Sequence, residues 1–93
     1  MHYLVIEHFR NRDPLPIYRR FRDRGRLMPD GLRYVSSWIL DDLSCCYQLM
    51  ETDKRELLDQ WMDQWSDLMA FEVFPVLSSA EVQARLAPQL SSA

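Results

Sequence analysis

Three glutamates interrupt apolar, β-rich stretches of the chain: Glu7, Glu51 and Glu72. An ionised carboxylate is costly to bury unless it is paired, so burial raises its pKa. Two such carboxyls on one unprotected sheet face would have raised pKa values, and one of them could act as a general base. The alternative is that each carboxylate pairs with an arginine, such as Arg33, or lies at the edge of a strand.

The histidines and cysteines do not form a known metal or nucleophile motif. His2 and His8 point to the same face of one expected strand but lie roughly 20 Å apart, so one chain cannot place both on one metal. His8 could bind heme or a metal across a dimer, or it could simply be hydrogen-bonded. Cys45 and Cys46 are adjacent, and in a strand they would point to opposite faces, which disfavours a disulfide. We expect two reduced thiols, no metal site and no cofactor.

Aromatic residues form a second kind of candidate site. Tyr34, Trp38 and Tyr47 share one face of a hairpin if its turn is centred on Asp42 and Leu43. They would then form either the wall of a pocket for a flat ligand or the packing of a protein interface, because aromatic side chains suit both.

The elements that would position these residues follow a β-α-β-β-α-β order. β-Branched and aromatic residues predict four strands, at 3–9, 32–40, 45–51 and 71–77. Asp13 and Pro14 predict the start of a first helix. Apolar residues three and four apart, from Leu57 to Met69, predict a second helix behind the capping box that begins at Asp53.

Two further details follow from the helical patterns. Trp61 and Trp65 lie on the apolar side of the second helix and are predicted to be in the core. Ser78 and Glu81 repeat the capping pattern, and the short helix behind them is expected to end at Pro88. Residues 1–93 are interpreted as one ferredoxin-like domain, of which 78–93 form a short C-terminal helix and tail.

Composition limits the partners. The 93-residue chain is 47% hydrophobic and has a formal net charge of −3, which argues against nucleic acid because phosphate binding needs a basic field. Seven arginines fall between Arg10 and Arg26; they predict the solvated face of a helix or an anion-binding patch. No apolar run approaches the roughly 18 residues of a membrane span, and the N-terminus lacks a secretory pattern. We expect a cytoplasmic protein without nucleic-acid or membrane partners.

The predicted sheet is apolar on both faces. Two strand-helix-strand units joined by a hairpin give an α+β, ferredoxin-like domain with a four-stranded antiparallel sheet and both helices on one face. The other face would carry large apolar residues, which a lone antiparallel sheet does not expose to water. A homodimer with the two sheets facing each other, a dimeric α/β barrel, removes that exposure.

Several segments also resemble a known family. They are Val5-Ile6-Glu7, residues 29–32, Ser37-Trp38, residues 47–53 and residues 71–76. Together they are similar to a bacterial family of short proteins, domain-of-unknown-function family 3303, through about residue 82. The resemblance implies the dimeric α/β barrel superfamily, which includes heme-degrading and antibiotic-biosynthesis monooxygenases. It implies no activity, and no catalytic residue can be carried over.

These observations favour a homodimer that binds a small apolar or aromatic molecule on the uncovered sheet face. The predicted site consists of Glu7, Trp38, Tyr47, Tyr34 and Glu51, with Leu4 and Ile6 assigned to the helix-covered side. Two alternatives remain open: an oxygenase-like or heme-linked enzyme of the superfamily, and a purely structural association module. No motif names a reaction.

Overall fold

The structure is a computed structural model that describes residues 1–91. The strands are β1 (His2–Phe9), β2 (Arg33–Ile39), β3 (Cys45–Glu51) and β4 (Met69–Val76). The helices are α1 (Leu15–Arg24), α2 (Arg55–Asp63) and α3 (Ser79–Ser91), with a short 3₁₀ turn, η1 (Arg10–Arg12), after β1.

The four strands form one antiparallel sheet in the order β2-β3-β1-β4. This is the ferredoxin-like arrangement, so the predicted α+β fold is confirmed. Trp38 lies opposite Tyr47 across the hairpin between β2 and β3, as a turn centred on Asp42 and Leu43 requires. The predicted register of that hairpin is therefore correct.

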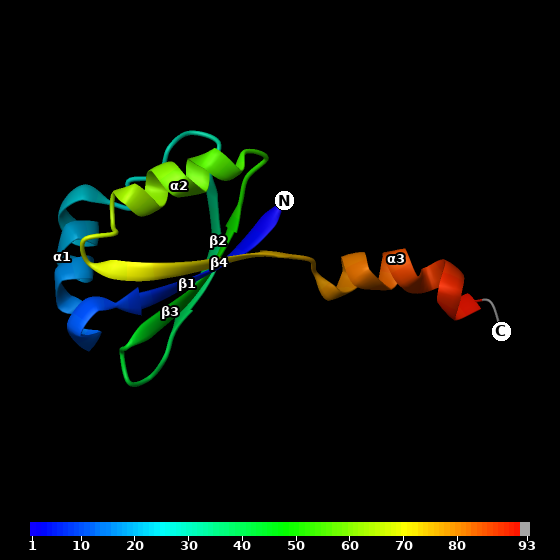
Figure 1. Cartoon of the computed structure of the whole chain (residues 1–93), viewed down its shortest axis with the longest axis horizontal. Coiled ribbons are helices and arrows are strands. Elements are labelled where there is room, and N and C mark those ends of the chain that lie inside the picture. Colours follow the sequence, from blue (N-terminus) through cyan, green and yellow to red (C-terminus); the bar gives the residue numbers. More distant parts are fainter. Residues whose placement is uncertain (92–93) are drawn as a thin grey trace.

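The hydrophobic core lies between the sheet and the two helices α1 and α2 (Figure 1). Val5 and Phe9 of β1 face Leu58 and Trp61 of α2 in this core. The odd-numbered residues of β1 therefore point to the helices, and Leu4 and Ile6 point away from them. The expectation that Leu4 and Ile6 lie under the helices is wrong, because both alternating sets on β1 are apolar and periodicity alone could not choose between them.

An irregularity in β2 changes which side chains share a face. The pairing with β3 shifts between Tyr34, opposite Met50, and Ser36, opposite Leu49. One extra residue, Val35, is accommodated there, and such a bulge reverses the facing of a strand beyond it. Tyr34 consequently lies on the helix-covered face, whereas Trp38 lies on the uncovered one.

The prediction for the two helix tryptophans is confirmed. Trp61 and Trp65 are buried, and the indole nitrogens of both donate hydrogen bonds to the carbonyl oxygen of Arg26, at 3.1 and 3.0 Å. These bonds attach the loop after α1 to α2. The regular helix ends at Asp63, so Trp65 occupies the turn that follows rather than the helix itself.

The C-terminal helix α3 projects away from the rest of the domain (Figure 1), and none of its described residues is buried. Ser78 and Glu81 form the predicted reciprocal cap, with 3.1 Å bonds in both directions. Pro88 lies inside the helix, so the expectation that it ends the helix is wrong. The predicted tail beyond Ser91 lies outside the described residues. Over residues 1–91 we find no helix with the length and hydropathy that crossing a membrane requires.

Candidate functional site

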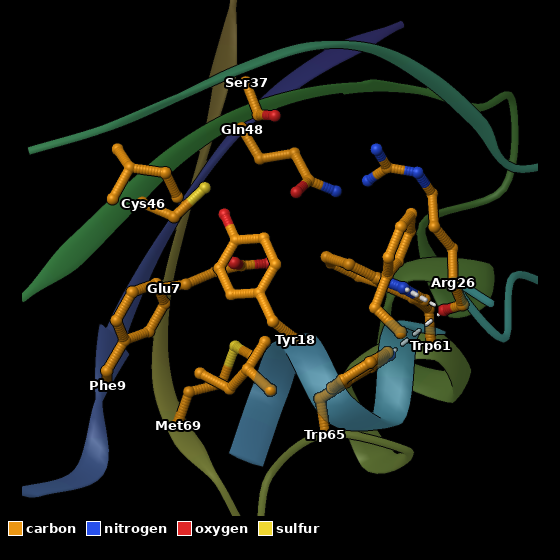
Figure 2. A pocket seen from close by; sticks show the side chains of 13 residues that line it. Glu7, Phe9, Tyr18, Arg26, Ser37, Cys46, Gln48, Trp61, Trp65 and Met69 are labelled. Carbon is orange, nitrogen blue, oxygen red and sulfur yellow. Dashed lines mark hydrogen bonds between the residues drawn. The ribbon is translucent and has the colours of Figure 1, made fainter. Parts of the chain in front are cut away.

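A cavity of about 130 Å³ lies between α1, the loop after it and the helix-covered face of the sheet (Figure 2). Its walls are apolar on the side of α2 and β4, where Trp61, Trp65 and Met69 lie. Its polar groups come from the sheet and the α1 segment: Glu7, Tyr18, Arg26, Ser37, Cys46 and Gln48. An apolar recess with a few polar groups directed into it is the usual form of a small-molecule site.

Glu7 is the one carboxyl among the residues that line the cavity. It sits in the middle of β1, opposite Cys46 of β3 and Phe71 of β4, and only 6% of its surface is exposed. Burial raises the pKa of Glu7 from 4.5 to about 7, against smaller lowering effects of a hydrogen bond from Cys46 and the positive charge of Arg26. At neutral pH both the neutral and the ionised forms are therefore populated.

Cys46 lies beside Glu7 but is not a nucleophile in this environment. Burial raises the pKa of the Cys46 thiol far above its usual value, and the neighbouring Glu7 carboxylate raises it further. The neutral thiol is the form that can donate a hydrogen bond, whereas the thiolate is the reactive one. Cys46 therefore serves as a hydrogen-bonding neighbour of Glu7.

Arg26 brings the only guanidinium among the residues that line the cavity. Its guanidinium carbon lies 3.6 Å from the centre of the Tyr34 ring and 5.0 Å from that of Phe21, both in the range of cation–π contacts. The Tyr34 hydroxyl in turn hydrogen-bonds the Ser37 hydroxyl at 2.7 Å. The loop after α1 is thus attached to β2 through Arg26, and a positive charge is held near Glu7 without a direct ion pair.

Tyr18 lies at the mouth of the cavity. Half of its surface is exposed, yet its side chain points inward on the same side as Cys46 and Glu7 (Figure 2). Partial burial raises the pKa of Tyr18, and the negative charge of the Glu7 carboxylate raises it further, whereas Arg26 lowers it. Gln48, on β3, contributes an amide whose nitrogen contacts the sulfur of Met50 at 3.0 Å. A ligand entering past Tyr18 would meet a phenol, an amide and a carboxyl.

A comparison with models of protein families identifies the family of this chain. The model described as Domain of unknown function (DUF3303) matches residues 1–90. The chain belongs to this family. The searches of curated proteins and of solved structures found no significant match. The family description names no activity, so the chemistry must be argued from the cavity itself.

The five residues that were predicted to form one site do not come together in the structure. Glu7 and Tyr34 lie on the helix-covered face, where they were not expected. Trp38 and Tyr47 do lie on the uncovered face, with 68% and 37% of their surfaces exposed. The predicted convergence of Glu7 with these two aromatic residues is therefore wrong, because it depended on assigning β1 the opposite facing.

Glu51 is paired with an arginine, as the alternative interpretation of the strand carboxylates anticipated, whereas the partner of Glu72 is a histidine. Glu51 contacts the guanidinium of Arg33 and lies 3.5 Å from the imidazole of His2. Glu72 bonds His8 at 2.6 Å. Both pairs are on the uncovered side of the sheet at positions open to solvent. Among residues 1–91, no group of three or more His, Cys, Asp or Glu side chains is placed to hold a metal ion.

Four polar residues of the cavity were not proposed as site residues from the sequence: Tyr18, Arg26, Ser37 and Gln48. Gln48 had a signal, because it alternates with Cys46 and Met50 on one face of β3 and is the polar member of an otherwise apolar set. Arg26 had none, since it is one of seven arginines in a basic segment and only the fold of the following loop brings it over Tyr34.

Proposed function

We propose that the domain binds a small aromatic or apolar molecule in the cavity beneath α1, and that Glu7 exchanges a proton with it. The observation that carries this proposal is a carboxyl on the cavity wall whose pKa is raised to about 7 by burial. A general acid or base works best when its pKa lies near the working pH, because both protonation states are then available. A carboxyl in a recess whose pKa is strongly perturbed by burial is a candidate functional residue.

The volume of the cavity limits the ligand. At about 130 Å³ it is close to the ~150 Å³ of an engineered apolar cavity that binds benzene. Pockets for drug-sized ligands are larger, roughly 300–1,000 Å³. The cavity therefore suits one ring or a short chain, and the rest of a larger ligand would extend past Tyr18 and Phe21, both of which are partly exposed.

The polar groups indicate what the ligand carries. Glu7 and Gln48 lie on the floor formed by the sheet, and Arg26 lies at the side. A ligand hydroxyl would donate to the Glu7 carboxylate, while an amide or carbonyl would suit Gln48. A phenol combines the ring that fits the apolar wall with the hydroxyl that fits Glu7, and it is the simplest probe of this site.

The same cavity could also belong to an oxygenase-like enzyme of the dimeric α/β barrel superfamily, in which Glu7 would take part in catalysis. Glu7, as a base in an apolar cavity, could remove the proton of a phenol or enol, and deprotonated ring systems of that kind are easier to oxidise. The heme-linked version is disfavoured, because the cavity holds about one small ring and heme is several times larger.

A second property concerns association. We propose that the uncovered sheet face joins two copies of the chain. The supporting observation is the gathering of partly exposed apolar residues on that face: Leu4, Ile6, Trp38, Tyr47, Leu49 and Phe74. Contiguous apolar patches of this kind mark interfaces, and a twofold pair would cover the same patch on both copies. A purely structural association module would retain this property and lack ligand binding.

Binding of phenol tests the cavity proposal. We expect phenol to shift the backbone amide resonances of Glu7, Cys46 and Gln48 in ¹H–¹⁵N spectra, with an affinity that rises as the pH increases through 7. The rise follows because the ionised carboxylate is the better acceptor. Glu7→Gln should remove the pH dependence, whereas Glu56→Gln, an exposed glutamate on α2, should leave it unchanged. Equal affinities at pH 6 and pH 8 in the unmodified protein would contradict the role of Glu7.

A further inference from the structure

No other part of the described residues 1–91 covers the apolar stripe of α3. Val82, Leu86 and Leu90 are spaced four residues apart and therefore lie along one side of the helix. Their exposed fractions are 38%, 42% and 76%, and α3 stands off the domain (Figure 1). A solitary helix of 13 residues is marginal in water, because most helix stability in proteins comes from packing an apolar side. This helix therefore needs a surface to pack on.

From these observations we propose that α3 is an exchanged arm: in the homodimer, the stripe of each α3 packs on the partner copy. This inference rests on the homodimer proposed above and adds the element that completes its interface. The connection between Val76 and Ser79 is short, and the Ser78–Glu81 cap fixes the start of the helix. From this start the arm runs away from its own sheet (Figure 1), where a second copy can receive it.

The area of the sheet face supports the need for the arm. Four strands about 4.8 Å apart and about 25 Å long present a footprint of roughly 480 Å². Two such faces in contact cover roughly 950 Å² in total, which is below the 1,200–2,000 Å² of a stable interface. A 13-residue helix about 20 Å long and 10 Å wide adds roughly 200 Å² on itself and as much on the partner. Two arms bring the total to roughly 1,750 Å², within the range of stable dimers.

Charge does not oppose this packing. Within residues 79–91 the only charged side chains are Glu81 and Arg85, so the arm is neutral overall. On the sheet face the Glu51 carboxylate pairs with the Arg33 guanidinium, and the Glu72 carboxylate is hydrogen-bonded to the His8 imidazole. The arm carries no net charge, so the carboxylates of a second copy do not repel it.

A matched pair of substitutions tests the arm in the full-length chain. Leu86→Glu places a charge in the middle of the stripe, whereas Ala84→Glu places the same charge on the opposite side of α3. We expect sedimentation equilibrium to give about twice the 11.1 kDa chain mass for the unmodified protein and for Ala84→Glu. Leu86→Glu should raise the dimer dissociation constant at least tenfold. Far-UV circular dichroism of each variant reports whether the domain has remained folded.

The possible outcomes separate the two proposals. If the unmodified chain is monomeric at all concentrations, the homodimer is refuted and the arm with it. If the chain is a dimer and Leu86→Glu dissociates no more readily than Ala84→Glu, the homodimer stands and the exchanged arm is refuted. If the chain is a monomer, and Leu86→Glu but not Ala84→Glu lowers its free energy of unfolding, then α3 packs on its own domain. That result also overturns the proposal. Should Leu86→Glu unfold the chain, Leu86→Gln is the milder variant to compare with Ala84→Gln.

Discussion

Replacing Glu7 by Gln should change how the stability of the domain depends on pH. Glutamine has nearly the shape of the protonated glutamate but cannot ionise. In the folded protein the pKa of Glu7 is raised to about 7 by burial, whereas the ordinary value of 4.5 applies to an exposed carboxyl. In the unmodified protein the folded and unfolded states therefore differ in proton binding at Glu7 mainly between these two pH values, and in Glu7→Gln they do not differ at this position.

The sign of the effect follows from proton linkage. Below pH 4.5 the carboxyl is neutral in both the folded and the unfolded chain, so its stabilising contribution is fully present. Between 4.5 and about 7 the unfolded chain loses the proton while the folded chain keeps it, so the free energy of unfolding falls as the pH rises. The difference between the two pKa values corresponds to roughly 3 kcal/mol, all of which is lost above the folded-state pKa.

Urea unfolding at several pH values between 4 and 8.5 measures this effect. We expect the unfolding free energy of Glu7→Gln minus that of the unmodified protein to grow by roughly 3 kcal/mol across this range. The other ionisable groups are the same in both proteins and cancel in the difference, and a constant offset from the new amide does not alter the slope. Glu56→Gln, at an exposed position, is the control and should show no growth. A change of less than ~0.5 kcal/mol, the usual scatter of surface substitutions, would refute the burial argument for Glu7.

Other changes should have distinct effects. Trp61→Ala removes a buried indole and the hydrogen bond to the Arg26 carbonyl, and should lower the free energy of unfolding by roughly 3–5 kcal/mol; an unchanged melting temperature would show that the core is assigned wrongly. Trp38→Ser, at an exposed position on the uncovered face, should weaken the dimer in sedimentation equilibrium without lowering monomer stability. Tyr18→Phe keeps the ring at the cavity mouth but removes its hydroxyl, so phenol should still bind and the pH dependence of its affinity should be unchanged. Loss of that pH dependence would indicate that Tyr18, and not Glu7, exchanges the proton.

Much of the fold was determined by local sequence patterns. The order of strands and helices follows from β-rich runs and from apolar residues at helical spacing, and the hairpin register follows from the short turn between Trp38 and Tyr47. The burial of Trp61 also follows from helical spacing. These features depend on residues close together in the chain, so local propensity and periodicity are enough to predict them.

The candidate site depended on information that local patterns do not contain. Both alternating sets of β1 are apolar, so periodicity could not decide whether Glu7 or its neighbour Ile6 faces the helices. Only one of the two sets can pack against the helices, and the other must face away. The irregularity at Val35 moved Tyr34 to the opposite face from Trp38, and bulges have no reliable signal in a single sequence.

The sequence by itself thus determined the elements, their order and the presence of a carboxylate in an apolar strand. Only the tertiary structure decided that this carboxylate is enclosed under α1, and that Arg26 lies over Tyr34 from a loop remote in sequence. The physical reason is that burial raises the pKa of Glu7 through the combined exclusion of water by several elements. That exclusion is a property of their packing, which no single segment specifies.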